Sequence, residues 1–378
     1  MIRNFISIAF AGVTLMAASS CRADRTGVKP QPADTAAVSQ PEEARLSLLF
    51  AGDLMQHGPQ IKAALRPDGS YNYDECFAAI KQEVERADVA IANLEVTLGG
   101  PPYAGYPQFR APDEYLKASV DAGFDIMLTA NNHCLDSRRK GLERTIMMLD
   151  SLNVPHLGTY VNQESRDRTY PFLLEKNGMR IVLLNFTYGT NGLVVERPNV
   201  VNMMDTTEMR ADIAKARQMN PDVIIAMPHW GIEYQLLPSS EQKNVAKWLI
   251  DHGVDHVIGG HPHVAQPLEL SEDSCHLVAW SMGNVISNMT KANTYGGYMV
   301  RMEFTKKGSL TRLSDCGYTL YWVSKPQENG GKHNFRVLPI DVPDAGLTQT
   351  EKNSRDAIRT SMRRLMEKHT KGVKEYKM

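Results

Sequence analysis

The amino-acid sequence predicts an α/β protein built around a substantially parallel β-sheet. The first observation is a series of seven short apolar runs bounded by polar residues, which suits strands that are buried on both faces. The second is that amphipathic stretches separate these runs, and strand–helix alternation is typical of parallel sheets. The third is the composition: of 378 residues, 42% are hydrophobic and 22% are charged, which is ordinary globular usage and excludes wholesale disorder.

The beginning of the chain predicts an export signal. Arg3 precedes an apolar segment over residues 5–18, and the sequence ASSC ends at Cys21. This pattern is typical of a bacterial lipoprotein signal over residues 1–21, whereas ordinary secretion with cleavage after a small residue is the alternative. We therefore expect a cell-envelope protein that is lipid-anchored at Cys21 and faces the periplasm or the outer-membrane surface. Residues 22–45 lack large apolar side chains and predict a flexible tether.

One folded domain is expected over residues 46–343, followed by a C-terminal helical extension over 344–378. The expected strands are the apolar runs at 47–53, 88–95, 124–133, 180–189, 222–231, 254–263 and 276–284. The expected helices are the amphipathic stretches at 73–87, 140–152, 209–219 and 241–252. Beyond residue 297, apolar residues alternate with period two around a Lys-Gly turn, which predicts antiparallel strands that complete the domain.

Residues able to bind a metal follow six of the seven expected strands. They are Asp53, Glu95, Asn132 with His133, His229, His261 with His263, and Asn284. Any one of these residues alone would not indicate a metal site, because an Asp at the end of a strand is often a helix cap and a single His is often a core residue. Ligands in open α/β sheets bind at the carboxyl ends of the strands, so the coincidence at six strand ends favours a metal site.

The expected metal ligands are Asp53, Glu95, Asn132, His229, His261 and His263. Three imidazoles combined with carboxylate and amide oxygens suit Mn, Fe or Zn, and disfavour Ca²⁺ or a thiolate zinc site. The set is large enough for two divalent transition-metal ions that share a bridging carboxylate. Two such ions lie about 3.5–4 Å apart and activate water while they stabilise the attacking and leaving oxygens.

We expect His133 to have a catalytic role rather than to be a metal ligand. Asp136 lies three residues further along the chain, so its carboxylate can orient the imidazole and raise its basicity. We therefore expect His133 to act as a general acid or to stabilise the transition state, with Asp136 as its partner. The alternative for Asp136 is an N-cap of the following helix.

Six motifs, in this order along the chain, resemble the CapA, or PGA_cap, family of poly-γ-glutamate capsule synthesis proteins, which is related to the calcineurin-like metallophosphoesterases. The motifs are GDLM (52–55), ANLE (92–95), NNHCLD (131–136), HWGIEY (229–234), GGHPH (259–263) and SMGN (281–284). The resemblance implies a metallophosphatase-like layered sandwich of mixed sheets flanked by helices. It also implies that Asp53 is the first aspartate of the metal site and that Glu95 is the bridging carboxylate.

Two positions depart from the phosphoesterase pattern. Met55 stands where phosphoesterases have a histidine, and Glu95 stands where they have an aspartate. His57 is a candidate replacement for the missing histidine ligand. These departures argue against a generic phosphatase and leave open whether the substrate is a phosphate ester.

The resemblance implies a metal-dependent, hydrolase-like lipoprotein that acts in the synthesis, export or processing of an anionic capsule polymer, poly-γ-glutamate in this family. The expected partners are that polymer or a small phosphorylated substrate, the membrane, and capsule synthesis or export subunits. The alternative is a non-catalytic, polymer-binding scaffold subunit of an envelope export complex. Lys and Arg number 42 against 43 Asp and Glu, which gives no basic footprint for nucleic acid.

Overall fold

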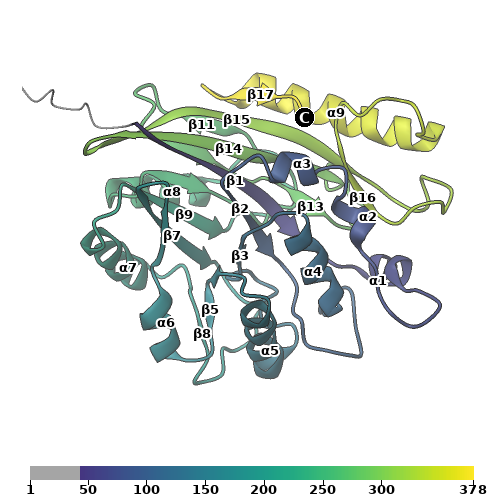
Figure 1. Ribbon diagram of the computed structural model, residues 1–378, viewed down its shortest axis with the longest axis horizontal. Coiled ribbons are helices and arrows are strands. Elements are labelled where there is room, and N and C mark those ends of the chain that lie inside the picture. The colour runs from purple at the N-terminus through teal and green to yellow at the C-terminus, as the bar shows by residue number, and fades with distance from the viewer. Residues whose placement is uncertain (1–42) are drawn as a thin grey trace, which may run out of the picture. The chain divides into compact units, whose positions relative to one another are not determined.

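The computed structural model describes residues 43–378, and Figure 1 shows this part of the chain as layers of β-strands with helices around them. The expected α/β architecture of mixed sheets flanked by helices is confirmed. The predicted signal peptide, Cys21 and nearly all of the predicted tether lie outside the described residues. Within residues 43–378, no helix is long and apolar enough to cross a bilayer.

The larger sheet has nine strands in the order β16-β15-β14-β1-β2-β3-β4, with β13 beside β1 and β17 beside β15. Its parallel part consists of β1 (Ala44–Leu54), β2 (Val89–Leu94), β3 (Ile126–Leu128), β4 (His156–Leu157) and β13 (Asn284–Ile286). Its antiparallel part consists of β14 (Gly296–Lys307), β15 (Leu310–Ser324) and β16 (Arg336–Pro339). The antiparallel hairpin around the Lys-Gly turn is therefore confirmed.

The smaller sheet has six strands in the order β11-β12-β10-β9-β7-β6. Its inner strands β7 (Met179–Thr187), β9 (Val223–His229), β10 (His256–Ile258) and β12 (Leu277–Ala279) run parallel. The edge strands β6 (Phe172–Lys176) and β11 (Leu268–Leu270) run antiparallel to their neighbours. A separate two-stranded sheet joins β5 (Thr159–Tyr160) and β8 (Val200–Val201).

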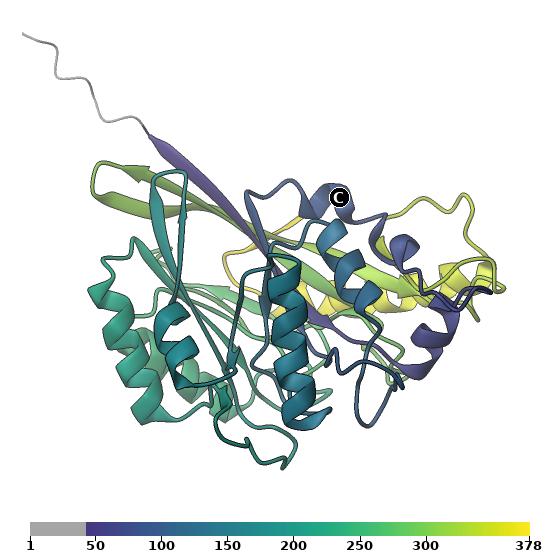
Figure 2. The same cartoon turned by 60° about the horizontal axis from the view of Figure 1, so that its bottom comes forward.

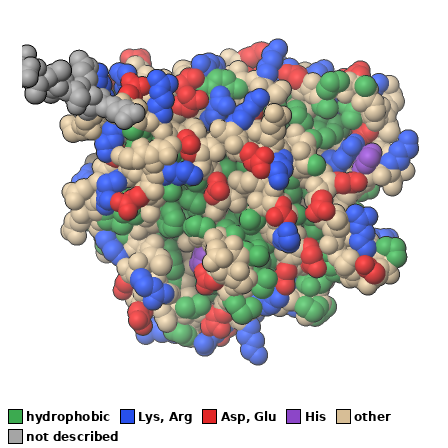
Figure 3. Space-filling view, in the orientation of Figure 1, with side chains coloured by type: hydrophobic (Ala, Val, Ile, Leu, Met, Phe, Trp, Pro, Cys, Tyr) green, Lys and Arg blue, Asp and Glu red, His purple; other side chains and the backbone are tan. Residues whose placement is uncertain are grey.

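Nine helices are assigned within residues 43–378. They are α1 (Gly58–Ala64), α2 (Asp74–Phe77), α3 (Lys81–Val84), α4 (Asp113–Asp121), α5 (Arg138–Ser151), α6 (Gln163–Thr169), α7 (Thr206–Gln218), α8 (Ser240–Asp251) and α9 (Gln349–His369). Helices α4 and α5 are neighbours, as Figure 2 shows, and Arg144 donates two hydrogen bonds of 2.7 Å to the carboxylate of Asp113 between them. Figure 3 shows acidic and basic side chains intermixed on one face of the molecule.

Strand β1 shows how the layers pack. Leu46, Leu48 and Phe50 belong to the buried cluster that also contains the apolar residues of β7, β9, α7 and α8. Leu49 and Ala51 belong to a second buried cluster, which contains residues of α2 and α4. Because successive side chains of a strand point to opposite faces, β1 contacts the smaller sheet on one face and the helices on the other.

Three segments differ from the expected elements. Residues 73–87 form two short helices instead of one. Between them the Ile80 N–H donates a hydrogen bond to the Phe77 carbonyl, which makes a tight turn, and both side chains stay buried. The run 276–284 is divided between β12 and β13, because the chain crosses from one sheet to the other at Gly283 (φ 74°). The last segment is not helical throughout: α9 ends at His369, Gly372 (φ 69°) turns the chain, and β17 (Lys374–Tyr376) pairs with β15.

Candidate metal centre

The predicted ligands converge where the carboxyl ends of strands from both sheets meet. Asp53 is the penultimate residue of β1, Glu95 follows β2, and His229 ends β9, while His261 and His263 follow β10. All five side chains are buried. Strands β3 and β10 end earlier than expected, so the residues that follow them are carried on loops, which can turn several side chains toward one point.

The converging side chains form two groups that share one carboxylate. One group is Glu95, His229 and His261, and the other is Asp53, Glu95 and His263; in each, the candidate ligand atoms lie within 4.8 Å of one another. Glu95 Oε1 lies 3.4 Å from His229 Nε2 and 3.8 Å from His263 Nε2. A carboxylate common to two groups is the arrangement that a bridged two-metal centre requires.

Two buried polar atoms in these groups lack a hydrogen-bond partner. They are Glu95 Oε1 and His261 Nδ1. Leaving a buried acceptor unsatisfied costs about 1–3 kcal/mol, so an orphaned carboxylate oxygen and an orphaned imidazole nitrogen side by side are explained by a cation that they would both contact. The donor set of imidazole nitrogens and carboxylate oxygens suits divalent transition metals. The residues present therefore fit two such ions.

The backbone is also shaped around the centre. His261 has φ 98° and His263 has φ 57°, in a region where non-glycine residues are strained and which is found mainly at functional sites. Gly260 precedes them, and a Cβ atom at that position would lie only 3.0 Å from Asp53 Oδ1. Glycine thus allows the chain to pass beside the carboxylate before it turns both imidazoles inward.

The charges of the centre are strongly coupled. Burial alone would raise the pKa of Asp53, but its hydrogen bond to His263 and the proximity of His229 lower that pKa to about 2. Burial alone would lower the pKa of His263, but the Glu95 and Asp53 carboxylates raise it to about 9. Burial and the neighbouring histidines hold the pKa of His261 well below its usual range. Without metal, His263 therefore holds the proton that balances the carboxylates, while His261 is neutral.

Asn132 lies beside the first group. Its Oδ1 accepts a 2.8 Å hydrogen bond from His229 Nε2, and its Nδ2 donates to Asn191 Oδ1 at 3.2 Å. The side-chain oxygen thus contacts the imidazole of a residue in the Glu95, His229 and His261 group. Asn132 is placed where the sequence predicts an oxygen ligand, and Asn191 holds its amide in that orientation.

His133 and Asp136 form a buried pair next to the centre. His133 Nδ1 donates to Asp136 Oδ2 at 2.7 Å, and the same oxygen accepts from the backbone N–H of Phe109 at 2.7 Å. The N-cap of α5 is Ser137, so Asp136 does not take the alternative capping role. No described residue provides a hydrogen-bond partner for His133 Nε2. This nitrogen is therefore available for substrate, as the predicted role of His133 requires.

The sequence-based reasoning missed an amide that links the two carboxylates. Asn93 Nδ2 donates to Asp53 Oδ1 at 2.8 Å and to Glu95 Oε2 at 3.2 Å, and Asn93 Oδ1 accepts from Asn131 Nδ2 at 3.0 Å. The signal was present, because Asn93 lies two residues before Glu95 and so on the same face of an extended chain. Asn284 was only weakly indicated, and its Oδ1 lies 3.0 Å from His263 Nδ1.

His57, the candidate replacement ligand, belongs to neither group. Its Nδ1 accepts from the backbone N–H of Asn288 at 3.3 Å and lies 3.2 Å from Gln60 Oε1. The centroid of its ring lies 5.0 Å from that of Phe109, and the Phe109 ring also packs against the His133 ring at 4.6 Å. His57 thus contacts the residues around the centre, and its role as a replacement for the missing ligand stays a prediction.

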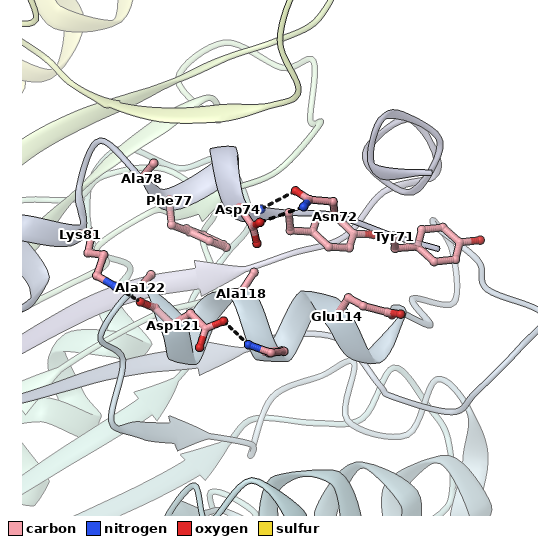
Figure 4. Close-up of a pocket in the computed structure, with 12 residues that line it drawn as sticks. Tyr71, Asn72, Asp74, Phe77, Ala78, Lys81, Glu114, Ala118, Asp121 and Ala122 are labelled. Carbon is pink, nitrogen blue, oxygen red and sulfur yellow. Dashed lines mark hydrogen bonds and ion pairs between the residues drawn. The ribbon is translucent and has the colours of Figure 1, made fainter. Parts of the chain in front are cut away.

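The pocket drawn in Figure 4 lies elsewhere, between α2, α3 and α4, and has a volume of about 480 Å³. None of the predicted site residues lines it. Its polar groups are engaged with one another: Asn72 donates to Asp74, and Lys81 donates to the Asp121 carbonyl. The chemistry of the molecule is therefore concentrated at the strand ends and not in this pocket.

The family model of the bacterial capsule synthesis protein PGA_cap matches residues 47–289, which contain all the residues of the centre. The chain belongs to this family. It is 26% identical over 287 residues to the capsule biosynthesis protein CapA of Bacillus anthracis, a match that covers 72% of this chain and 67% of that protein. It is 23% identical over 332 residues to the PGA biosynthesis protein CapA of Bacillus subtilis, covering 85% and 78%.

Solved structures with a similar fold include the calcineurin-like phosphoesterase YfkN of Bacillus subtilis. It has a TM-score of 0.43 and 15% sequence identity, and the match covers 86% of this chain and 99% of that one. A phosphatase of Mycoplasma pneumoniae has a TM-score of 0.43 and 12% identity, covering 76% and 96%.

Proposed function

We propose that this PGA_cap protein is a metal-dependent hydrolase of the cell envelope that acts in the synthesis, export or processing of an anionic capsule polymer. The observation that carries the hydrolase part is the pair of ligand groups sharing Glu95, with the His133–Asp136 pair beside them. The capsule part is supported by family membership and by the names of the relatives from two Bacillus species. A lipid anchor at Cys21 belongs to the same proposal and is supported by the ASSC sequence.

Each residue has a defined task in this proposal. The two groups would hold two divalent ions, which when bound polarise the scissile group and activate water. Asn93 holds the Asp53 and Glu95 carboxylates in place, and Asn191 orients the amide of Asn132. No other role is assigned to these amides.

His133 would supply the proton for the leaving group. Its Nδ1 proton is held by Asp136, whose carboxylate is in turn fixed by the Phe109 backbone N–H. This arrangement fixes the ring and leaves Nε2 without a hydrogen-bond partner among the described residues, so that a proton on Nε2 could pass to the departing atom. General acid catalysis of this kind contributes about 10²–10⁴-fold to the rate.

The test compares three variants of the full-length chain after loading with Mn²⁺. His133→Ala should keep its bound metal while turnover of aryl phosphodiesters or γ-glutamyl peptides falls about 10²–10⁴-fold. His261→Ala should lose one of the two bound ions and, with it, turnover, because it removes a ligand from one group only. His333→Ala, a half-exposed histidine that pairs with Glu75, is the matched control and should change neither quantity.

Two results would contradict the proposal. Loss of metal from His133→Ala would show that this imidazole is a ligand and not the acid. A metal-loaded wild type without turnover, combined with capsule polymer production that depends on the chain but not on His133, would favour the non-catalytic scaffold.

A further inference from the structure

We propose that Lys291 forms an anion-binding subsite at the rim of the metal centre, where the ring of Tyr234 positions its ammonium for a second acidic group of the substrate. This inference rests on the proposed function for the identity of the substrate. It goes beyond that function because it assigns a specificity-determining residue outside the ligand groups and requires a substrate with more than one negative charge.

Tyr234 is fixed to the loop that carries the histidine ligands. Its backbone has φ 67°, and its N–H donates a 2.8 Å hydrogen bond to the carbonyl of Pro262, between the two ligands of that loop. Its ring centroid lies 6.4 Å from that of His263.

Lys291 lies over the face of the Tyr234 ring. Its Nζ lies 3.8 Å from the centroid of the Tyr234 ring, well inside the range of a cation–π contact. No carboxylate of the described residues lies within 4.0 Å of this ammonium, so its charge is held in place but not neutralised. An ordered, unneutralised ammonium loses less freedom when it binds an anion than a free lysine side chain would.

The backbone around Lys291 is tied to the same centre. Its carbonyl accepts a 2.7 Å hydrogen bond from Thr294 Oγ1, and the Thr294 carbonyl accepts from Asn284 Nδ2 at 2.9 Å. The other atom of that amide, Oδ1, lies 3.0 Å from His263 Nδ1. Thr294 and Asn284 are fully buried, so these hydrogen bonds anchor the turn that carries Lys291 to the protein interior. The ammonium and the metal ligands are therefore connected through both Tyr234 and Asn284.

The placement defines the ligand. The ammonium is separated from the metal ligands by an aromatic ring: Lys291 Nζ lies 3.8 Å from the centroid of the Tyr234 ring, which in turn lies 6.4 Å from the centroid of the His263 ring. A single small anion cannot contact both, whereas a chain bearing several carboxylates or phosphates can. An exposed charge contact at about 4 Å in a high-dielectric setting corresponds to roughly a fivefold gain in affinity, and salt weakens it.

The experiment measures binding and does not depend on turnover. The probe is a fluorescent pentaglutamate peptide, titrated by anisotropy into the full-length, Mn²⁺-loaded protein at low ionic strength, with inorganic phosphate as the small anion. Lys291→Gln should weaken peptide binding about five- to tenfold while changing phosphate binding less than twofold and leaving metal content unchanged. Lys368→Gln, an exposed lysine on α9, is the control for net charge and should bind the peptide normally.

Two variants of Tyr234 test whether its ring positions the Lys291 ammonium or only lies near it. Tyr234→Phe keeps the ring face and should bind the peptide within twofold of the wild type. Tyr234→Leu removes the face and should lose as much affinity as Lys291→Gln. Unchanged binding by Lys291→Gln, an equal loss in Lys368→Gln, or equal losses in Tyr234→Phe and Tyr234→Leu would each overturn the subsite. Turnover without any dependence of binding on Lys291 would refute the subsite alone, whereas Lys291-dependent binding without turnover would refute only the hydrolase.

Discussion

Glu95 belongs to both ligand groups, so its substitution should change the number of metal ions bound per chain. Glu95→Gln keeps the shape of the side chain but removes the negative charge from both groups at once. Asp53→Asn affects only the group with His263, and His261→Ala affects only the group with His229. We therefore expect two bound ions per chain for the wild type, one each for Asp53→Asn and His261→Ala, and none for Glu95→Gln.

The free energy of unfolding should rise with the number of ions bound. A ligand that binds only the folded state stabilises it by about 4.1 kcal/mol when its free concentration is about a thousand times Kd. The wild type should gain two such increments when Mn²⁺ is added, the single-group variants one, and Glu95→Gln none. Elemental analysis after dialysis gives the stoichiometry, and denaturant unfolding with and without Mn²⁺ gives the increments.

Glu83→Gln is the matched control, because Glu83 is also a buried glutamate but pairs with Arg86, away from the centre. It should retain two ions. A Glu95→Gln protein that still binds one ion with wild-type affinity would refute the shared-carboxylate arrangement, since one group would then be complete without it.

Three further predictions concern pH, packing and anchoring. In the metal-free protein the pKa of His263 is raised to about 9, so its contribution to stability is present below about pH 6.5 and lost as pH rises through 9; a urea midpoint that does not fall over this range would contradict the pairing. Ile358→Ala, on the buried face of α9, should cost about 2–5 kcal/mol in denaturant unfolding without altering metal content, and a metal-depleted variant would speak against this separation. Cys21→Ala should abolish lipidation, so unchanged partitioning into detergent would exclude the lipoprotein.

The positions of the ligands were predictable because strand ends are legible in the sequence. An apolar run that stops at Asp53 or His229 shows both that a strand ends and that a polar side chain stands at its carboxyl end. The two facts together place such residues at the edge where sheets bind ligands. The pairing of His133 with Asp136 was likewise predictable, since the two residues are three positions apart and one turn of the chain brings such positions together.

The residues that surround the ligands were harder to predict from the sequence. Asn191 and Lys291 come from loops, and nothing in their sequence neighbours reveals which loop will fold over the centre. The division of residues 276–284 between two sheets was hidden for a different reason. Residues 276–284 are mostly apolar and resemble one strand, whereas the pairing of β12 with β10 and of β13 with β1 shows that the chain passes from one sheet to the other. A Cβ on Gly52 would lie 1.8 Å from the Gly283 carbonyl oxygen, so the crossing needs a glycine there.

The ligands of one ion are far apart in the order of synthesis. Asp53 and the loop of His261 and His263 are separated by 208 residues, yet Asp53 Oδ2 accepts from the backbone N–H of His261 at 3.4 Å. A chain synthesised only as far as residue 260 holds two of the three residues of each group, Glu95 with His229 and Asp53 with Glu95. Two ions bound as proposed would therefore enter only after the loop of His261 and His263 has folded against Asp53, because that loop supplies the last residue of each group.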